Sequence, residues 1–314
     1  MVSPDKNQST PVMLILLGFS EYPELQVPLF LLFLTIYAVT VVGNVGMVVV
    51  IKINLKLHTP MYFFLKHLSF VDFCYSTIIT PKLLENLVVE DRSISINACI
   101  TQFSIAAIFL MTEMVMLAVM AYDRFLAICY PFLYTVSMSP QCCVLLVTVA
   151  YTWGIISSIV LSYSILVLSF CESKIIDNFV CEYNVFLSAS CSDKHVSEIT
   201  LFILVNLNVF CTFIIILTSY LFIFVTIIKM HSGGGRYKAF STCSSHLMAV
   251  AIFYGTIIFL YCIPNSKNSS LIVKVGSVFY TVVIPMLNPF IYSLRNNDLK
   301  ETFRKIIDLK TISQ

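Results

Sequence analysis

The sequence predicts an all-α membrane protein: a bundle of seven transmembrane helices with a short amphipathic helix at its C-terminus. Of the 314 residues, 58% are hydrophobic and only 11% are charged. A soluble domain of this size needs more charge to cover its surface, so much of the apolar surface must face lipid. At about 20 residues for each crossing, the chain has room for roughly seven helices and no separate soluble domain.

Seven apolar segments follow one another along the chain, with short connections between most of them. The second segment is the weakest, because Lys66, Asp72 and Lys82 interrupt it. Pro285 and Pro289 lie in the seventh, where each removes a backbone donor and predicts a bend or hinge. The expected helices are residues 25–53, 60–87, 98–128, 142–168, 199–228, 239–262 and 271–294.

The distribution of basic residues predicts the orientation in the membrane, because lysine and arginine collect on the cytoplasmic side. With the N-terminus outside, 12 of the 19 lysines and arginines fall on that side. This predicts a multi-pass plasma-membrane protein with an extracellular N-terminus and a cytoplasmic C-terminus. The glycosylation sequon at Asn7 agrees with this placement, and a second sequon at Asn268 lies close to the membrane.

A shorter amphipathic segment follows the seventh helix. Leu299, Phe303 and Ile306 recur there at helical spacing with basic residues elsewhere, which predicts a helix lying on the membrane surface. The chain therefore divides into an extracellular tail (1–24), a transmembrane domain (25–295) and a cytoplasmic amphipathic helix with its tail (296–314).

No sequence motif points to catalysis. Gly233, Gly234 and Gly235 lack the following Gly-Lys-Ser/Thr of a phosphate-binding loop, so they predict a flexible cytoplasmic turn. There is no His-Glu-x-x-His run and no serine or cysteine protease signature. The sequence therefore gives no reason to expect an enzyme, a cofactor or a metal centre, and a net charge of +2 is too small to indicate nucleic-acid binding.

Four of the 11 cysteines fall on the extracellular side, where disulfides persist. They are Cys99 at the start of the third helix and Cys171, Cys181 and Cys191 in the long connection after the fourth. Four cysteines allow three pairings. A bond from the third helix to the long loop would fold that loop over the mouth of the bundle.

Buried polar residues are costly in a membrane and need an explanation. Asp72 and Glu113 lie inside the second and third segments, and Asn44 and Asn288 lie in the first and seventh. One interpretation is a hydrogen-bonded packing cluster, worth about 0.6–2 kcal/mol for each bond. The other, which the two acids favour, is a water-filled pocket that holds a cation and changes protonation during switching.

Asp123 and Arg124 close the third segment at its cytoplasmic end. They could be interfacial charges whose long side chains reach water. Arginine is, however, a permanent cation with a rigid fork of donors. Asp123 could hold it in one state and release it to another partner in a second state.

Several motifs resemble those of one family. They are LHTPMYFFL (57–65), MAYDRFLAIC (120–129), KAFSTCSSHL (238–247) and PMLNPFIYSLRN (285–296), together with Gly43-Asn44 and Ser219-Tyr220. In this order they cover nearly the whole chain and resemble the signatures of olfactory receptors, which are rhodopsin-like G protein-coupled receptors. The LHTPMY form resembles the tetrapod-type (class II) branch.

The resemblance implies a receptor that binds a small, mostly apolar, volatile odorant. It implies coupling to a stimulatory, olfactory-type heterotrimeric G protein that raises cAMP. It also implies the disulfides Cys99–Cys181 and Cys171–Cys191. The residues implied for switching and G-protein coupling are Asp123, Arg124, Tyr220, Asn288, Pro289 and Tyr292, and those implied for the cation pocket are Asn44, Asp72, Glu113 and Asn288.

Two positions depart from the family pattern. Phe125 stands where the family usually has tyrosine, and the lost hydroxyl bears on basal activity or coupling. No cysteine follows Cys262, so the C-terminal helix has no site for palmitoylation and must rely on its own apolar side chains.

A ligand pocket is expected in the outer half of the bundle, between the third, fifth, sixth and seventh helices and beneath the long loop. Helical counting from Arg124 selects its candidates on the third helix. For any single candidate, ordinary helix packing is an equally good interpretation. The candidates are Ala106, Ala107, Leu110, Met111, Leu204, Val205, Asn208, Tyr254, Ile258, Tyr261 and Thr281. An apolar ligand with a carbonyl or hydroxyl group fits this lining best.

Other receptor and transport classes fit less well. An amine receptor needs an acid on the outer third helix, where Ala106 stands. An opsin needs a lysine within the seventh helix, but none lies between Val275 and Arg295, and Lys274 is at the outer edge. A transporter or channel predicts internal repeats or charged pore-lining helices, and neither is present. A receptor of the same family that senses metabolites outside the nose stays open, as does one that no longer signals.

Overall fold

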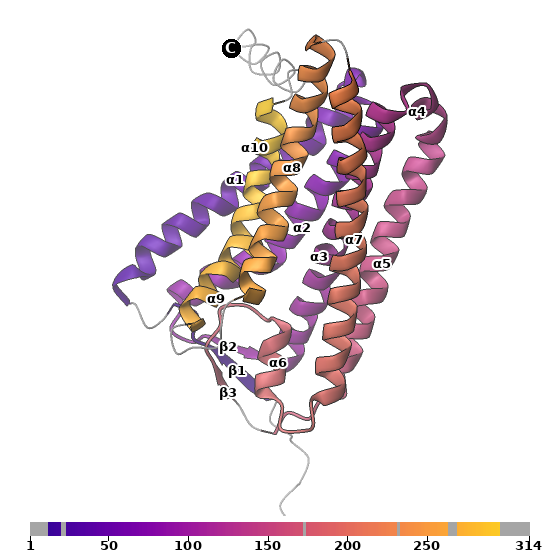
Figure 1. Cartoon of the computed structure of the whole chain (residues 1–314). Helices are drawn as coiled ribbons and strands as arrows, with labels where there is room; N and C mark the ends of the chain where they lie inside the picture. Colours follow the sequence, from indigo (N-terminus) through magenta and orange to yellow (C-terminus); the bar gives the residue numbers. More distant parts are fainter. Residues whose placement is uncertain (1–11, 20–22, 172–173, 231–232, 263–268, 296–314) are drawn as a thin grey trace, which may run out of the picture.

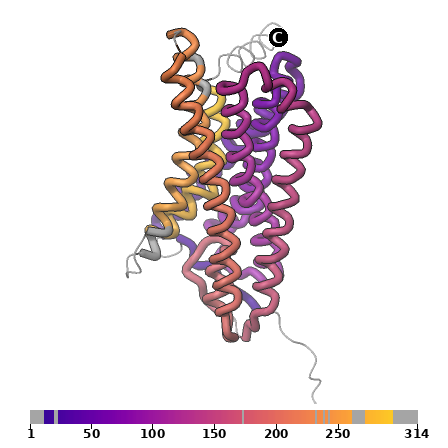
Figure 2. The backbone as a smooth tube through the Cα atoms, turned by 45° about the vertical axis from the view of Figure 1, so that its right-hand side comes forward, coloured from indigo at the N-terminus to yellow at the C-terminus, as the bar shows by residue number. Residues whose placement is uncertain are grey.

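A computed structural model describes residues 12–19, 23–171, 174–230, 233–262 and 269–295. Seven long helical segments run side by side as a bundle, seen from two directions in Figure 1 and Figure 2. They are α1 (Gln26–Ile53), α2 (Pro60–Val88), α3 (Ile96–Cys129), α5 (Pro140–Leu166), α7 (His195–Lys229), α8 (Gly233–Cys262) and a last segment formed by α9 (Ser269–Val278), η3 (Phe279–Val283) and α10 (Ile284–Arg295).

The outer surface of this bundle is apolar, as a membrane protein requires. Six of the seven segments, all but α2, are long and apolar enough to cross a membrane. The α2 helix contains Lys66, Asp72 and Lys82, and it packs against α1, α3 and α10. Large apolar side chains point outward, among them Val42 (73% exposed) and Phe202 (68%). The predicted seven-helix membrane bundle is therefore confirmed.

Local capping explains where two of the long helices begin. The Ser95 side chain accepts a hydrogen bond from the backbone N–H of Ala98 (3.3 Å), and Ser139 does the same for Cys142 (3.3 Å). Each satisfies one of the backbone donors that the first turn of a helix leaves free. Both helices consequently start two residues earlier than the hydropathy of the sequence indicates.

The triglycine segment differs from its prediction as a flexible turn. Gly233, Gly234 and Gly235 form the first turn of α8, which extends the sixth helix six residues beyond the predicted start at 239. Glycine is only about 1 kcal/mol less favourable than alanine in a helix. Packing of the rest of α8 can therefore offset the low helix propensity of three glycines in its first turn.

A three-stranded sheet closes one end of the bundle, here called the sheet end, and the opposite end is called the far end (Figure 1). The central strand β1 (Met13–Leu16) pairs antiparallel with β2 (Ser93–Ser95) and parallel with β3 (Lys174–Ile176). Its side chains Leu14 and Leu16 are fully buried. Part of the predicted N-terminal tail is therefore an integral strand of the fold.

Two disulfides fasten the long loop at the sheet end. Cys99 of α3 is bonded to Cys181 (Cα–Cα 5.4 Å), and Cys171 is bonded to Cys191 (6.2 Å). Both pairs are those that the family resemblance implies. Between them the loop forms the short helix α6 (Tyr183–Ala189), which packs beside the bundle (Figure 1).

The seventh helical segment changes its winding halfway along. Phe279–Val283 forms a π-helical turn, and Pro289 lies inside α10. A π turn inserts one extra residue into a helix and often occurs at functional sites. The backbone also passes close to α1, because a Cβ atom added to Gly43 would lie 3.3 Å from Pro289 Cβ.

We expect Gly154→Ala to destabilise the folded protein by about 1–3 kcal/mol. A Cβ atom at Gly154 of α5 would lie 2.5 Å from the backbone oxygen of Ile108 in α3 and would overlap the Thr112 hydroxyl. A backbone oxygen within a helix cannot move aside at small cost, so the helices must separate. A lower midpoint of thermal unfolding in detergent would measure this effect.

Gly46 of α1 and Gly255 of α8 provide matched controls, because a Cβ atom at either meets nothing within 4 Å. Gly46→Ala and Gly255→Ala should leave the midpoint unchanged or raise it slightly. An unchanged midpoint for Gly154→Ala would show that the α3–α5 contact is looser than described.

Candidate functional site

A polar cluster lies at the centre of the bundle. Asp72 of α2, Glu113 of α3 and Asn288 of α10 are 0%, 2% and 4% exposed. The Asn288 side-chain amide donates to Asp72 Oδ2 (2.9 Å). Asn44 of α1 donates to the backbone oxygens of Thr40 (3.0 Å) and Pro285 (2.9 Å). Four of the predicted polar residues are thus buried, and three of the seven helices meet at Asp72, Glu113 and Asn288.

Several oxygen atoms of this cluster lack a hydrogen-bond donor among the described residues. They are Asp72 Oδ1, Glu113 Oε1 and Asn44 Oδ1. Leaving buried acceptors without partners costs free energy, and two neighbouring carboxylates cannot both be charged without a counter-ion. Carboxylate and amide oxygens are the ligands of small, hard cations. The donor set is therefore compatible with a cation, and the cation pocket stays a prediction.

The predicted switch residues lie at the far end of α3. Asp123 Oδ1 accepts a hydrogen bond from the Tyr134 hydroxyl (2.8 Å) in the short helix α4 (Pro131–Ser137). Among the described ion pairs there is none between Asp123 and Arg124, so Tyr134 rather than Arg124 holds this carboxylate. Arg124 is 5% exposed, and its Nε and Nη1 atoms have no acceptor in the described part of the chain.

A hydrogen-bonded chain links three helices beside Arg124. His246 Nε2 of α8 lies 3.1 Å from the Leu117 backbone oxygen, which can only accept, so Nε2 is the donor. His246 Nδ1 then accepts from the Tyr220 hydroxyl of α7 (2.8 Å). Arg124 is within electrostatic range of Tyr220, His246 and Tyr292, whose hydroxyl has no described partner.

Sequence reasoning assigned no role to His246 or Tyr134. His246 lies inside the sixth-helix motif, and an ionisable residue inside a membrane helix is itself a functional signal. Tyr134 lies in a short connection, and no sequence pattern places it beside Asp123. Phe125, the departure from the family pattern, packs its ring against Tyr130 and Phe222 at 5.6 Å each.

Five of the predicted ligand residues pack in two apolar clusters at the sheet end. Met111, Leu204 and Val205 pack in the cluster that contains Cys181 and Tyr183. Ala106 and Leu110 pack in the cluster that contains Phe179 and Val180. Because residues 179–183 belong to one stretch of the long loop, that stretch forms a roof over both clusters.

The predicted polar pocket residues are bound to other parts of the protein. Asn208 accepts from the Trp153 indole N–H (2.9 Å), and its amide contacts the sulfur of Met114 (2.9 Å). The Tyr254 hydroxyl is hydrogen-bonded to Thr212 (2.6 Å). These contacts hold α5, α3, α7 and α8 together, which is the packing interpretation that the sequence left open.

Three further candidates lie on the sixth and seventh helical segments. Thr281 donates to the backbone oxygen of Ser277 (2.7 Å) and is 1% exposed. Ile258 is 54% exposed and lies off the buried face of α8, which runs through Phe253 and Tyr254. The side chain of Tyr261 lies outside the described residues.

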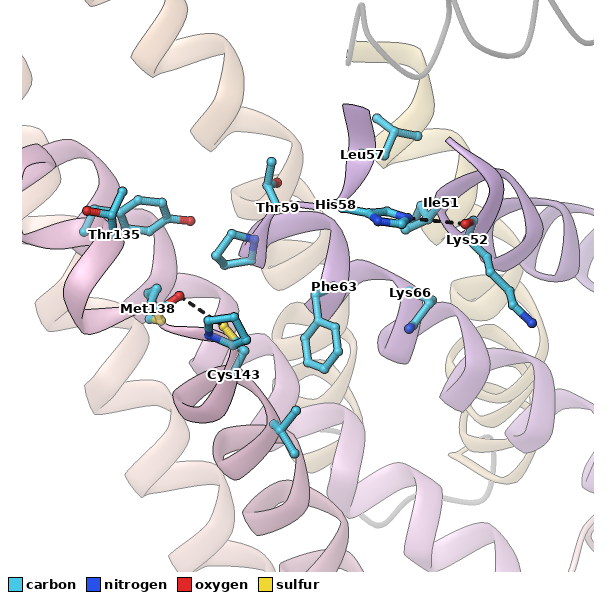
Figure 3. A pocket seen from close by; sticks show the side chains of 14 residues that line it. Ile51, Lys52, Leu57, His58, Thr59, Phe63, Lys66, Thr135, Met138 and Cys143 are labelled. Carbon is cyan, nitrogen blue, oxygen red and sulfur yellow. Dashed lines mark hydrogen bonds between the residues drawn. The ribbon is translucent and has the colours of Figure 1, made fainter. Parts of the chain in front are cut away.

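Two of the cavities among the described residues lie away from the predicted pocket. One, of about 510 Å³, lies at the far end between α1, α2, α4 and α5 (Figure 3). The other, of about 530 Å³, runs along α3, α5 and α7. It touches Asn208, but its lining includes the exposed Tyr122, Val149 and Leu207, so it faces the membrane.

Polar contacts at the sheet end attach the long loop to the seventh helix. Glu182 accepts from the Tyr280 hydroxyl (2.8 Å) and from the Asn178 amide (3.5 Å). Burial raises the pKa of the Glu182 carboxyl group, and these hydrogen bonds oppose that rise. Lys274 of α9 forms an ion pair with Asp177 and donates to the Gly18 backbone oxygen (3.0 Å). The loop, the N-terminal segment and the seventh helix are thus joined.

A polar core in the middle of the seven-helix bundle separates a disulfide-bonded loop at the sheet end from a buried arginine at the far end. This arrangement is that of a seven-helix receptor of the G protein-coupled type. A family model described as "Olfactory receptor" matches residues 33–310. The chain belongs to the olfactory receptor family.

Individual relatives agree over nearly their full lengths. The chain is 60% identical to Olfactory receptor 5D13 of Homo sapiens, over 99% of both chains. It is also 60% identical to Olfactory receptor 5D18 of Homo sapiens over 100% of both, and to Olfactory receptor 1165 of Mus musculus over 97% of this chain and 96% of that one. This is a family of receptors, not of enzymes.

Proposed function

We propose that this chain is an odorant receptor that binds a small, mostly apolar, volatile ligand in the outer half of the bundle. Binding activates a stimulatory heterotrimeric G protein and raises cAMP. Family membership is the observation that carries this proposal, because relatives with 60% identity over the whole chain are named olfactory receptors. The buried Arg124 at the end opposite the loop supports it, since a ligand near one end must act on a partner at the other.

The proposed orientation places the sheet end outside the cell and the far end in the cytoplasm. Both disulfides lie at the sheet end, and disulfides persist in extracellular surroundings. The proposed location is the plasma membrane, with residues 1–24 outside and 296–314 inside. Asn7, its proposed glycosylation site, and the C-terminal amphipathic helix both lie outside the described residues.

The proposed ligand position is between the two apolar clusters, under residues 179–183 of the loop. Leu204, Val205, Ala106 and Leu110 are partly buried there, so their side chains can repack around a ligand. Asn208, Tyr254 and Thr281 would reach the ligand only by exchanging their present hydrogen bonds. We also propose that Asp72, Glu113, Asn44 and Asn288 hold a cation whose release accompanies switching.

We expect Leu204→Ala to raise the agonist concentration for half-maximal response by about tenfold. Each CH₂ group removed from an apolar contact costs about 0.8 kcal/mol, and the truncation removes several carbon atoms. An active odorant is first found with a cAMP reporter in cells that supply a stimulatory G protein. Dose–response curves at matched surface expression then compare the variant with the unchanged receptor.

Ile203→Ala is the control on the same helix, because Ile203 is 59% exposed toward the membrane and should leave the response unchanged. Equal shifts for Leu204→Ala and Ile203→Ala would contradict the proposed ligand position. If no odorant raised cAMP while the receptor reached the cell surface, the proposed function itself would fail.

A further inference from the structure

The cavity at the far end has one basic wall and one apolar wall. Its volume of about 510 Å³ falls in the range of ligand sites. Figure 3 shows Lys52 of α1 and Lys66 of α2 on one side of it and Met138 and Cys143 on the other, with Phe63 between them. The described residues that line the cavity include no aspartate or glutamate.

The two lysines on the basic wall are available to a negatively charged ligand. In the described part of the chain, neither Lys52 nor Lys66 forms an ion pair with a carboxylate within 4.0 Å. Lys52 is exposed, and Lys66 Nζ lies 5.1 Å from the centre of the Phe63 ring. Two unneutralised ammonium groups beside an apolar surface attract a ligand that is anionic at one end and apolar at the other.

The backbone around this cavity is fixed by local hydrogen bonds. His58 Nε2 donates to the Lys52 backbone oxygen (3.3 Å) at the end of α1, and the dashed line in Figure 3 marks this contact. The Asn54 side chain accepts from the Lys56 backbone N–H (3.0 Å). These bonds close the turn between α1 and α2, so the cavity exists before a ligand enters and binding orders little additional chain.

We propose that this cavity binds the phosphorylated headgroup of an anionic lipid from the cytoplasmic leaflet. Lys52 and Lys66 would contact the phosphates. Phe63 and Val144 would contact the upper part of the acyl chains. Basic pockets between helices on the cytoplasmic side suit such headgroups, because that leaflet carries the anionic lipids. The proposal rests on the orientation given above.

Occupation of this cavity would influence the switch residues. Tyr134 lines the cavity, and its hydroxyl holds Asp123, the neighbour of Arg124. A lipid that contacts α4 therefore favours one position of Tyr134 over another and shifts the position of Asp123 with it. The lipid would act as a regulator of coupling without occupying the odorant site.

The test measures binding of phosphatidylinositol 4,5-bisphosphate to the purified full-length receptor in phosphatidylcholine nanodiscs without odorant. A lysine near anionic lipid contributes about fivefold in affinity, so Lys52→Gln should weaken binding about fivefold and Lys52→Gln with Lys66→Gln about 25-fold. Replacing both with arginine should retain binding. Midpoints of thermal unfolding equal to that of the unchanged receptor exclude misfolding of the variants. If the double variant does not fold, the loss of affinity in Lys52→Gln alone tests the proposal.

Lys56→Gln and Lys229→Gln are the matched controls, because both lysines are exposed near the far end but neither lines the cavity. They should change affinity less than twofold. Equal losses in the controls, or no loss in the double variant, would overturn the proposal. If soluble inositol trisphosphate bound as tightly as the lipid, the proposal that the ligand is a membrane lipid would be wrong. The binding measurement uses no odorant, so its outcome does not depend on whether the proposed odorant response is correct.

Discussion

Replacing Cys99 and Cys181 together with alanine is expected to destabilise the folded receptor by about 2–5 kcal/mol and to remove most of it from the cell surface. The bond joins residues 82 positions apart, so it closes a long loop and restricts the unfolded chain strongly. Both cysteines are buried, at 0% and 4% exposure, where the bond anchors the roof over the two apolar clusters. Surface labelling and the midpoint of thermal unfolding measure the effect.

The second disulfide offers a comparison within the same loop. Cys171 and Cys191 are only 20 positions apart and both are exposed, so their replacement with alanine should cost less stability. If the two double variants lost stability equally, the anchoring role of Cys181 would be wrong and loop closure alone would not explain the result.

Arg124→Gln is expected to abolish odorant-evoked cAMP while leaving the receptor folded. Arg124 is almost fully buried, and two of its nitrogen atoms have no acceptor in the described part of the chain. A buried charge without a partner destabilises the conformation that contains it. Removing the charge should therefore stabilise this conformation by about 1 kcal/mol or more. The variant should then convert less readily to the active conformation, in which the guanidinium of the unchanged receptor would find a partner.

The measurement pairs a cAMP assay with thermal unfolding of the same variant. Arg124→Lys keeps the charge but loses the planar fork, so it should signal weakly. Arg92→Gln at the sheet end removes a positive charge remote from the switch and should preserve signalling in proportion to its surface expression. A full cAMP response from Arg124→Gln at matched surface expression would show that Arg124 is not required for switching.

The sequence predicted the helices well, because each requires a long apolar run that few other structures need. Even α2 was identified despite Lys66, Asp72 and Lys82. Of these three residues only Asp72 is buried, in a helix that packs against α1, α3 and α10. The polar cluster could also be predicted, because a carboxylate such as Asp72 inside an apolar segment has few reasons to be there. The starts of α3 and α8 were missed by two and six residues, where capping and glycine extension rather than hydropathy set the boundary.

Contacts between distant residues could not be predicted from the sequence. The strand β1 has four residues, too few for a period to stand out, and its partners lie about 80 and 160 positions later. The sequence made Asn208 a candidate pocket residue on the fifth helix, but it could not show that Trp153 would reach it from α5. The Glu182–Tyr280 hydrogen bond spans 98 positions and likewise follows from the fold alone.

The central place of β1 in the sheet has a consequence for biosynthesis. This strand is synthesised first, yet β3 follows only after α5 has been made. Until then the strand has an open edge that other extended chains can pair with. Quality control should therefore retain the nascent protein until the loop after the fourth crossing has been made. Fusion tags attached just before residue 13 should slow maturation more than tags at the C-terminus.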